Sequence, residues 1–305
     1  MIYKLSTDQK NATSEEVGGK AYPLLQLVSS GIPVPEGFVI SSQEYRKFLE
    51  RNNLIEKINN FSGKHGIDPN NLREIRDLIE KGTFDKRIIK GVEDFLSGHE
   101  SKYFSIRSSA DVEDAQKSSF AGKFESYLGV EKDAVLDYAK KCYASVFTDR
   151  VASYADPEKL KDINMAVIIQ ELLDSEVSGV CFTANPLDAD SDAIIIEAIY
   201  GIGEYLVQGS VKPDNYIIEK ETVIPLEVEF NAQPRKMVLS EKNGGLCLKN
   251  NPCENEQKLS GEKMAELSKI AKKIEKIQGK NRDIEWAFSD DKFFILQSRP
   301  IVFNK

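Results

Sequence analysis

The stretch Asp283-Ile-Glu-Trp-Ala-Phe-Ser-Asp-Asp-Lys-Phe-Phe-Ile-Leu-Gln-Ser-Arg-Pro300 sets two runs of strand-forming residues on either side of a polar turn. This pattern is typical of a β-hairpin. Because one face of a hairpin beside a core must be apolar, hydrophobicity fixes the register. Pairing Glu285 with Gln297 gathers five apolar side chains on one face: Ile284, Trp286, Phe288, Phe294 and Leu296. This register predicts a three-residue loop, Asp290 to Lys292.

The opposite face of this hairpin carries Asp283, Glu285, Gln297 and Arg299. A carboxylate beside a side-chain amide suits a hard cation such as Mg²⁺, which prefers oxygen ligands. An arginine two residues further on suits a phosphate oxygen. The alternative is a solvated outer face with an Arg–Asp ion pair, which has little energetic value at a surface. The remaining sequence must decide between them.

Composition excludes several classes of protein. The chain has 305 residues, 41% of them hydrophobic and 30% charged, as in a soluble globular protein with one bilobed domain or two domains. Its net charge of -8 disfavours nucleic-acid binding, which depends on a basic surface. No apolar run is long enough to span a membrane. The 4 scattered cysteines match no zinc spacing and indicate free thiols in a reducing, cytoplasmic environment.

Strands and helices mix without the regular alternation of a doubly wound sheet, which predicts the α+β class. A helix is expected from Lys20 to Ser30, with Pro23 in its first turn and Gly31 after its end. Residues 43–98 have a charged helical pattern and are expected to form a helical insertion in the first lobe. Residues 165–173 and 178–183 are expected to be two strands that pair with each other.

Three further elements combine a cation with glycine or serine. Gly18-Gly19-Lys20 opens a helix, where anions bind well, although the same triplet is common in plain turns. Arg107 ends a strand beside two serines and could hold a phosphate, or it could pair with a nearby carboxylate. Gly122 and Lys123 could cover a phosphate in a glycine loop, or they could belong to an ordinary hairpin connection.

Gln170-Glu-Leu-Leu173 closes an apolar strand. Backbone groups at such a strand end can read an adenine edge in an apolar pocket, although the end of a core strand has the same pattern. Together, the cationic elements, the strand end and the carboxylate–amide–arginine face form the inventory that Mg²⁺-nucleotide binding needs.

In this order the motifs resemble the ATP-binding domain of the phosphoenolpyruvate synthase, pyruvate phosphate dikinase and rifampicin phosphotransferase family. The matching segments cover nearly the whole chain. They are Gly18-Gly-Lys-Ala21, Gly31-Ile-Pro-Val-Pro-Glu-Gly-Phe38, Arg107-Ser-Ser-Ala110 with Glu113-Asp114, Ser119-Phe-Ala-Gly122, Gln170-Glu171, Ser178-Gly179, Phe182-Thr-Ala-Asn-Pro186, Gly201-Ile-Gly-Glu204, Asp283-Ile-Glu285 and Leu296-Gln-Ser-Arg-Pro300.

The resemblance implies an ATP-grasp-like fold that binds ATP and Mg²⁺ between an N-terminal lobe, residues 1–170, and a C-terminal lobe, residues 171–305. It also implies a role for each site residue. Lys20, Arg107 and Arg299 would be catalytic and contact phosphates, and Gly122, Lys123 and Ser126 would lie in the loop over them. Gln170 and Glu171 would lie at the adenine edge, and Glu285 and Gln297 would hold the metal.

Two departures from the family pattern affect the expected function. Lys123 stands where the family usually has glutamine, which adds positive charge. The mobile domain with its Thr-x-His signature is absent, so the phosphorylated histidine is expected on a partner protein or a missing domain, and the small-molecule acceptor elsewhere. The alternatives are a self-sufficient ATP-grasp kinase or ligase and a nucleotide-sensing module. A sensor would not need both the metal set and the phosphate set.

Overall fold

The computed structural model describes residues 1–6, 12–61, 68–111, 124–153, 157–186, 192–240 and 245–303. The chain forms two compact units. Unit 1 comprises Met1–Tyr22 and Glu36–Leu172, and unit 2 comprises Pro23–Pro35 and Leu173–Lys305. The sequence led us to expect two lobes divided once, at residue 170. In the structure, residues 23–35 of the expected first lobe belong to unit 2. That segment belongs there because Leu27 and Ile32 are buried in the apolar cluster of unit 2.

Unit 1 is a five-stranded antiparallel sheet in the order β1-β2-β5-β3-β4, with the helices α2 to α6 on one face and the start of α1 on the other. Its strands are β1 (Ile2–Lys4), β2 (Gly37–Ile40), β3 (Tyr103–Ala110), β4 (Ser126–Glu131) and β5 (Met165–Glu171). Its helices are the first part of α1 (Ser14–Ser29), α2 (Ser42–Arg51), α3 (Leu54–Phe61), α4 (Pro69–Lys81), α5 (Lys86–Ser97), α6 (Val135–Ala144) and α7 (Asp149–Ala152), with short 3-10 helices at Lys132–Ala134, Ser145–Phe147 and Pro157–Asp162.

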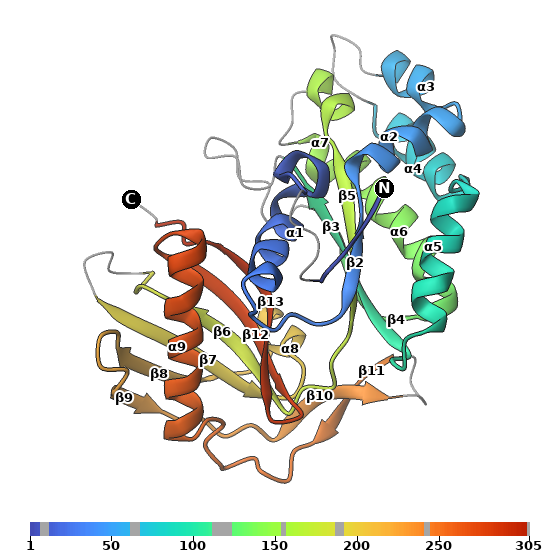
Figure 1. Ribbon diagram of the computed structural model, residues 1–305. Coiled ribbons are helices and arrows are strands. Elements are labelled where there is room, and N and C mark those ends of the chain that lie inside the picture. Colours follow the sequence, from blue (N-terminus) through green and yellow to red (C-terminus); the bar gives the residue numbers. More distant parts are fainter. Residues whose placement is uncertain are drawn as a thin grey trace. The chain divides into compact units, whose positions relative to one another are not determined.

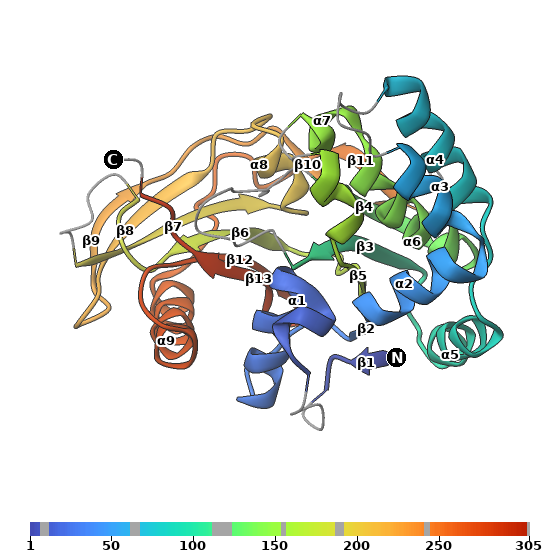
Figure 2. The same ribbon diagram turned by 90° about the horizontal axis from the view of Figure 1, so that it is seen from above.

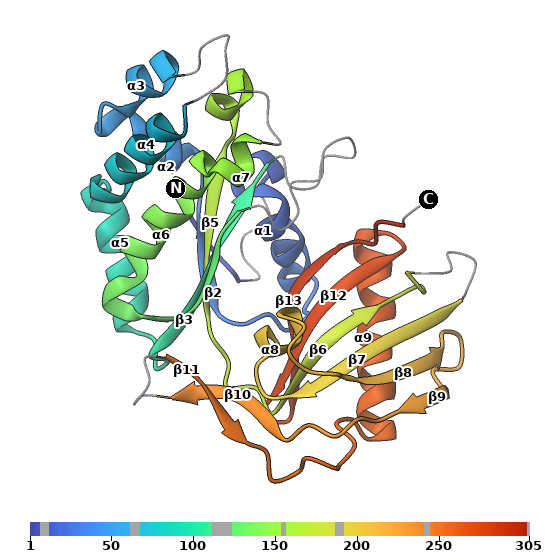
Figure 3. The same ribbon diagram turned by 180° about the vertical axis from the view of Figure 1, so that it is seen from behind.

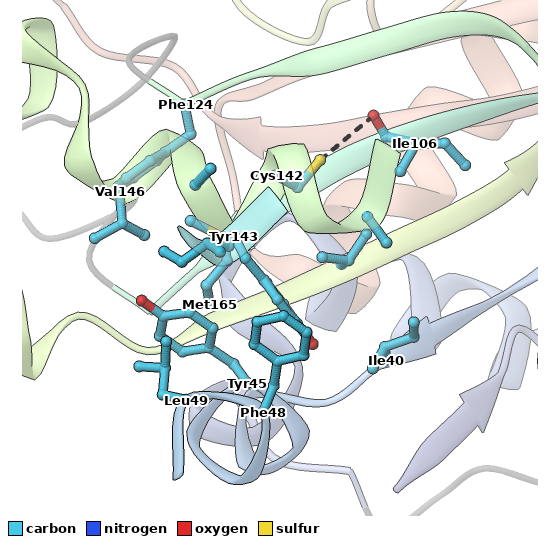
Figure 4. Close-up of a cluster of buried hydrophobic side chains, with 14 of the residues drawn as sticks. Ile40, Tyr45, Phe48, Leu49, Ile106, Phe124, Cys142, Tyr143, Val146 and Met165 are labelled. Carbon is cyan, nitrogen blue, oxygen red and sulfur yellow. Dashed lines mark hydrogen bonds between the residues drawn. The ribbon is translucent and has the colours of Figure 1, made fainter. Parts of the chain in front are cut away.

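The core of unit 1 lies between the sheet and the helices α2 to α6, which gather on one side of β2, β5 and β3 in Figure 2. Figure 4 shows Tyr45 and Phe48 of α2 meeting Tyr143 of α6 and Met165 of β5 in one cluster. The Tyr45 and Tyr143 ring centroids are 4.8 Å apart. Packing of this kind fixes which face of the sheet is turned away from the helices.

Unit 2 is built on a six-stranded antiparallel sheet in the order β13-β12-β6-β7-β8-β9. Its strands are β6 (Val177–Phe182), β7 (Ala193–Tyr200), β8 (Asp214–Glu219), β9 (Pro225–Glu229), β12 (Arg282–Ser289) and β13 (Lys292–Pro300). A separate hairpin joins β10 (Arg235–Ser240) and β11 (Gly245–Asn250), and the helices are α8 (Glu204–Val207) and α9 (Gly261–Gln278). Figures 1 and 3, seen from opposite sides, show α9 on one face of the large sheet. Both units confirm the predicted α+β class.

The closing hairpin confirms one part of its predicted register and corrects another. Glu285 pairs with Gln297, as predicted, but the register shifts between Glu285 and Trp286, so that Leu296 is bulged out. The turn therefore has two residues, Asp290 and Asp291, with φ 50 and 53. Positive φ at both positions is the pattern of a type I′ turn, and aspartate tolerates this conformation.

The bulge also changes which aromatic residues enter the core. Ile284, Trp286 and Phe288 are buried as predicted, but their partners on β13 are Phe293 and Ile295. The predicted partners, Phe294 and Leu296, are only partly buried. A one-residue slip exchanges the two faces of a strand, and the bulge confines that exchange to the turn end of the hairpin.

The predicted pairing of residues 165–173 with 178–183 is wrong. β5 pairs with β2 and β3 in unit 1, whereas β6 pairs with β12 and β7 in unit 2. The chain crosses from one unit to the other at Leu172, between these two strands. Strands that follow one another in a sequence often pair. Here β5 packs into the apolar core of unit 1 and β6 into that of unit 2, so they do not.

A fully buried ion pair joins Lys258 to Asp214, the first residue of β8 in unit 2. Lys258 Nζ is 2.7 Å from Asp214 Oδ1, and both side chains have an exposed fraction of 0%. Asp214 also accepts hydrogen bonds from the backbone N–H groups of Lys258 and Asn231 and from the Tyr216 hydroxyl. Charges without water are tolerated only with such complete partnering.

No helix in the described part of the chain combines the length and the apolar character needed to cross a bilayer.

Candidate functional site

In unit 1, the sheet face turned away from the helices carries the predicted arginine. Phe104 and Ile106 of β3 are buried among the helices, so the intervening Arg107 lies on the opposite face. Ser126 of β4 pairs with Arg107 and shares its face. Gln170 of β5 pairs with Ser105, two residues before Arg107, and lies on this face as well. The structure therefore brings Arg107, Ser126 and Gln170 together on one surface of unit 1.

The start of α1 brings Lys20 to the same strand. Its Nζ donates a hydrogen bond to the backbone oxygen of Ser108, 3.2 Å away. Ser108 is the residue that follows Arg107 in β3. Two further bonds fix the approach: Ser109 Oγ donates to the Val17 oxygen and accepts from the Ala21 N–H. Lys20 thus joins the face that carries Arg107.

Close contact with β3 depends on Gly18. Its φ is 79, and a Cβ at this position would lie 2.1 Å from the Ser109 oxygen. Only glycine satisfies both conditions, because a side chain would be strained in φ and would overlap the backbone of β3.

We expect Gly18→Ala to destabilise unit 1 by about 3 kcal/mol, since positive φ and overpacking each cost about 1–3 kcal/mol. Hydrogen exchange of the β3 and β5 amides measures this change. Gly31→Ala is the matched control, because Gly31 also has positive φ (72) but has no atom within 4 Å of the added Cβ. Equal losses in the two variants would contradict the close approach of α1 to β3.

Gln170 and Glu171 point their side chains to opposite faces of the sheet. Gln170 is buried on the Arg107 face, whereas the Glu171 carboxylate lies on the helix side, 3.9 Å from His99 Nε2. A ligand on the Arg107 face could therefore contact the Gln170 side chain and the backbone of the strand end, but not the Glu171 carboxylate. Gly122 and Lys123, predicted for the phosphate loop, lie outside the described residues.

In unit 2, the sheet face turned away from α9 carries the predicted metal and phosphate set. Gln297 Nε2 donates to Glu285 Oε1 at 3.3 Å, across the pair that the register predicts. Arg299 pairs with Asp283 and donates from Nε to its Oδ2 at 2.8 Å. The structure thus brings Glu285, Gln297 and Arg299 together, and it contains the Arg–Asp pair of the alternative interpretation as well.

The sequence reasoning missed Glu197 of β7. Glu285 is opposite Val180, and Val180 is opposite Glu197, so both carboxylates lie on one face of the sheet. Asn215 pairs with Glu197 on the next strand, and its Oδ1 is buried without a hydrogen-bond partner among the described residues. The signal was present, since Glu197 is the one charged residue of the apolar run from Ala193 to Tyr200.

Carboxylates are crowded on this face. Burial raises the pKa of Asp283, an effect that Arg299 opposes and Glu285 reinforces. Burial also raises the pKa of Glu197, and the charge of Asp283 adds to the increase. Neighbouring carboxylates repel one another, which disfavours their ionisation. A bound cation would reduce this repulsion, so such a cluster favours cation binding.

Glu197 should therefore make stability depend on pH. The unfolded chain ionises Glu197 at a lower pH than the folded chain, so folding takes up a proton between the two pKa values, and stability falls as pH rises through that interval. We expect Glu197→Gln to stabilise unit 2 near neutral pH and to have no such effect in acid. Urea unfolding followed by the fluorescence of Trp286, the single tryptophan, measures this difference. Glu227→Gln, an exposed change on β9, is the control, and an equal gain there would contradict the prediction.

The chain is similar to known proteins along almost its whole length. Residues 14–305 match the family model described as pyruvate phosphate dikinase, AMP/ATP-binding domain. A probable phosphoenolpyruvate synthase of Methanocaldococcus jannaschii is 33% identical over 96% of this chain and 26% of its own length. A rifampicin phosphotransferase of Bacillus subtilis is 33% identical over 94% of this chain and 34% of its own length. Among solved structures, D-alanyl-alanine synthetase A from Vibrio cholerae is similar with a TM-score of 0.37 and 10% identity, over 94% of this chain and 56% of that chain.

The chain spans about a quarter to a third of the length of these two relatives. The family model, in contrast, covers all but the first 13 residues of the chain. The chain therefore belongs to the pyruvate phosphate dikinase AMP/ATP-binding domain family.

Proposed function

We propose that this domain binds ATP with Mg²⁺ in an ATP-grasp-like manner and passes a phosphoryl group to a histidine held by another domain or protein, with AMP as the nucleotide product. The observation that carries the proposal is the pairing of Glu285 with Gln297 on a face that also presents Arg299. In a chain of this family, that set supports a metal and phosphate site.

Each unit supplies cations suited to phosphate oxygens. In unit 1, Lys20 and Arg107 are supported by β3, and Ser126 lies beside Arg107. In unit 2, Arg299 is oriented by Asp283. Phosphoryl transfer depends mainly on positioning and on neutralising charge at the phosphate oxygens, which is the role we assign to Lys20, Arg107 and Arg299. Gly122 and Lys123 would complete the phosphate loop.

Glu285 and Gln297 would hold the magnesium ion. The hydrogen bond to Glu285 uses the amide nitrogen of Gln297, so a cation would be met by the amide oxygen. The described residues contain no group of three or more histidine, cysteine, aspartate or glutamate side chains placed to bind a metal. Mg²⁺ takes one or two protein ligands and completes its shell with water and phosphate oxygens, so one carboxylate and one amide oxygen would suffice. When bound, the ion would neutralise phosphate charge and orient the phosphates.

The acceptor histidine would come from outside the site described here. His99 is mostly buried, with 11% of its side chain exposed, and is held between two carboxylates. His65 lies outside the described residues. In the balanced reaction, ATP, water and a histidine give AMP, inorganic phosphate and phosphohistidine. We place this reaction in the cytoplasm, where thiols stay reduced, as all four cysteines are here.

The test uses ATP labelled on its β and γ phosphates, Mg²⁺, and a histidine-bearing domain taken from a longer relative. We expect acid-labile label on the histidine of that domain, only when both proteins are present. Label on a small molecule without the partner would overturn the proposal in favour of a self-sufficient kinase or ligase. ATP binding that survives Glu285→Gln, without product in any mixture, would instead indicate a nucleotide-sensing module.

A further inference from the structure

The imidazole of His99 lies at the end of β5, with a hydrogen bond at one ring nitrogen. It follows α5, and its ring packs against Phe95 and Phe104 with centroids 5.3 Å and 5.7 Å away. Its Nδ1 accepts a hydrogen bond from the backbone N–H of Ser101 at 3.2 Å. An accepting Nδ1 carries no proton in the neutral ring, so the proton is on Nε2.

Two carboxylates face that proton. Glu36 Oε2 is 3.3 Å from His99 Nε2, and Glu171 Oε2 is 3.9 Å from it. Nε2 itself is buried and makes no aligned hydrogen bond with either carboxylate. The Glu36 side chain is 77% exposed and that of Glu171 28%, so the N–H lies mainly in the field of the Glu171 carboxylate, which water screens less.

A backbone hydrogen bond joins Glu36 and Glu171 where β2 and β5 meet the boundary between the two units. The Glu171 N–H donates to the Glu36 oxygen at 2.8 Å, and the next residues, Gly37 and Gln170, form a pair between β2 and β5. The boundaries between the two units lie directly beside both residues, at Pro35/Glu36 and at Leu172/Leu173. The His99 N–H therefore lies beside the backbone bond that closes this strand end.

We propose that His99 is a positioning residue for the adenine base: its Nε2–H, set between Glu36 and Glu171, holds the end of β5 in the conformation that recognises adenine. This inference rests on the proposed function, ATP binding, and on the expectation from the sequence that the strand end at Gln170 and Glu171 borders the adenine. His99 touches neither phosphate nor metal in this account. Its loss should weaken adenine recognition and leave phosphate binding unchanged.

Two variants separate the N–H group from the ring. His99→Phe keeps an aromatic ring against Phe95 and Phe104 but has no N–H, whereas His99→Gln reaches the Nε2 position with an amide N–H. Calorimetric titration with ATP and, separately, with tripolyphosphate, both with Mg²⁺, compares a ligand with adenine and one without. For ATP we expect about fivefold to tenfold weaker binding by His99→Phe and less than about a twofold change by His99→Gln. Tripolyphosphate should bind wild type and both variants equally.

The outcomes are distinguishable. Equal weakening of ATP binding by both variants, parallel weakening of tripolyphosphate, or no change in either would overturn the role of His99. If wild type binds ATP no more tightly than tripolyphosphate, adenine recognition itself is absent, and the proposed function fails first. If His99→Phe does not fold, His99→Asn replaces it, because its amide reaches only the Nδ1 position and should also lose the effect on ATP.

Discussion

Replacing Glu285 by glutamine is expected to reduce histidine phosphorylation by about 100-fold or more, because a metal ion contributes several kcal/mol to the stabilisation of transition-state charge. The change removes a carboxylate ligand and keeps the size of the side chain, so the hairpin pair with Gln297 is retained. Initial rates at saturating ATP, measured over a range of Mg²⁺ concentrations, test this prediction. The loss should be partly recovered at high Mg²⁺, because weakened metal binding is its cause.

The control for this variant is Glu227→Gln on β9. Glu227 pairs with Ile217, which places it on the same sheet face as Glu285, but at the exposed edge of the sheet. The control should keep the rate and Mg²⁺ dependence of wild type. A Glu285→Gln enzyme that is as active as this control would remove Glu285 from the metal site.

Asp214→Asn is expected to lower the free energy of unfolding of unit 2 by about 3–5 kcal/mol, because it leaves the buried ammonium of Lys258 without its counter-charge. Both side chains are wholly inaccessible, and their Nζ–Oδ1 distance is 2.7 Å. Trp286 lies in the same unit and is the single tryptophan of the chain, so its fluorescence in a urea titration reports this unit. Lys258→Met added to Asp214→Asn should restore part of the stability, since no unpaired charge then remains.

An exposed ion pair of the same unit gives the contrast. Lys212 and Glu229 are 2.7 Å apart, but 66% and 51% of their side chains are exposed. Lys212→Met should therefore change the stability by less than about 1 kcal/mol. If it matches the effect of Asp214→Asn, burial is not what makes the Asp214–Lys258 pair important.

Sequence alone predicted the polar face of the closing hairpin because polar and apolar residues alternate along it. Glu285 and Gln297 pair as that alternation requires. The bulge at Leu296 could not be predicted, because Phe293, Phe294, Ile295 and Leu296 are all apolar and either pair of alternate residues could enter the core. Only contact with the rest of the cluster around α9 selects Phe293 and Ile295.

Other parts of the fold depend on contacts between residues far apart in sequence. The apolar runs of β5 and β6 are neighbours in the chain, yet each completes a different sheet. Residues 23–35 join unit 2 through Leu27 and Ile32, although they continue a helix that begins in unit 1. Periodicity identifies such elements, but it does not state which core each of them enters.

The candidate site shows the same limit. Lys20, Arg107 and Ser126 could be placed on one surface once strand register was known, and Glu285, Gln297 and Arg299 follow from the hairpin alone. Glu197 was missed because it lies in an apolar run with no local motif, and only the register of β6 with β7 and β12 places it on the face of Glu285. Gln170 and Glu171 read as one motif, but alternation along β5 sends their side chains to opposite faces.

The nucleotide product is the measurement that tests the proposed function most directly. With Mg²⁺, ATP and a histidine-bearing partner domain, ³¹P NMR of the reaction should show AMP and inorganic phosphate forming together, one of each for every phosphohistidine. Neither product should form without the partner, and Glu285→Gln should form both about 100-fold more slowly or slower still. ADP as the stable product, in the presence or absence of the partner, would contradict a dikinase-type transfer by this domain.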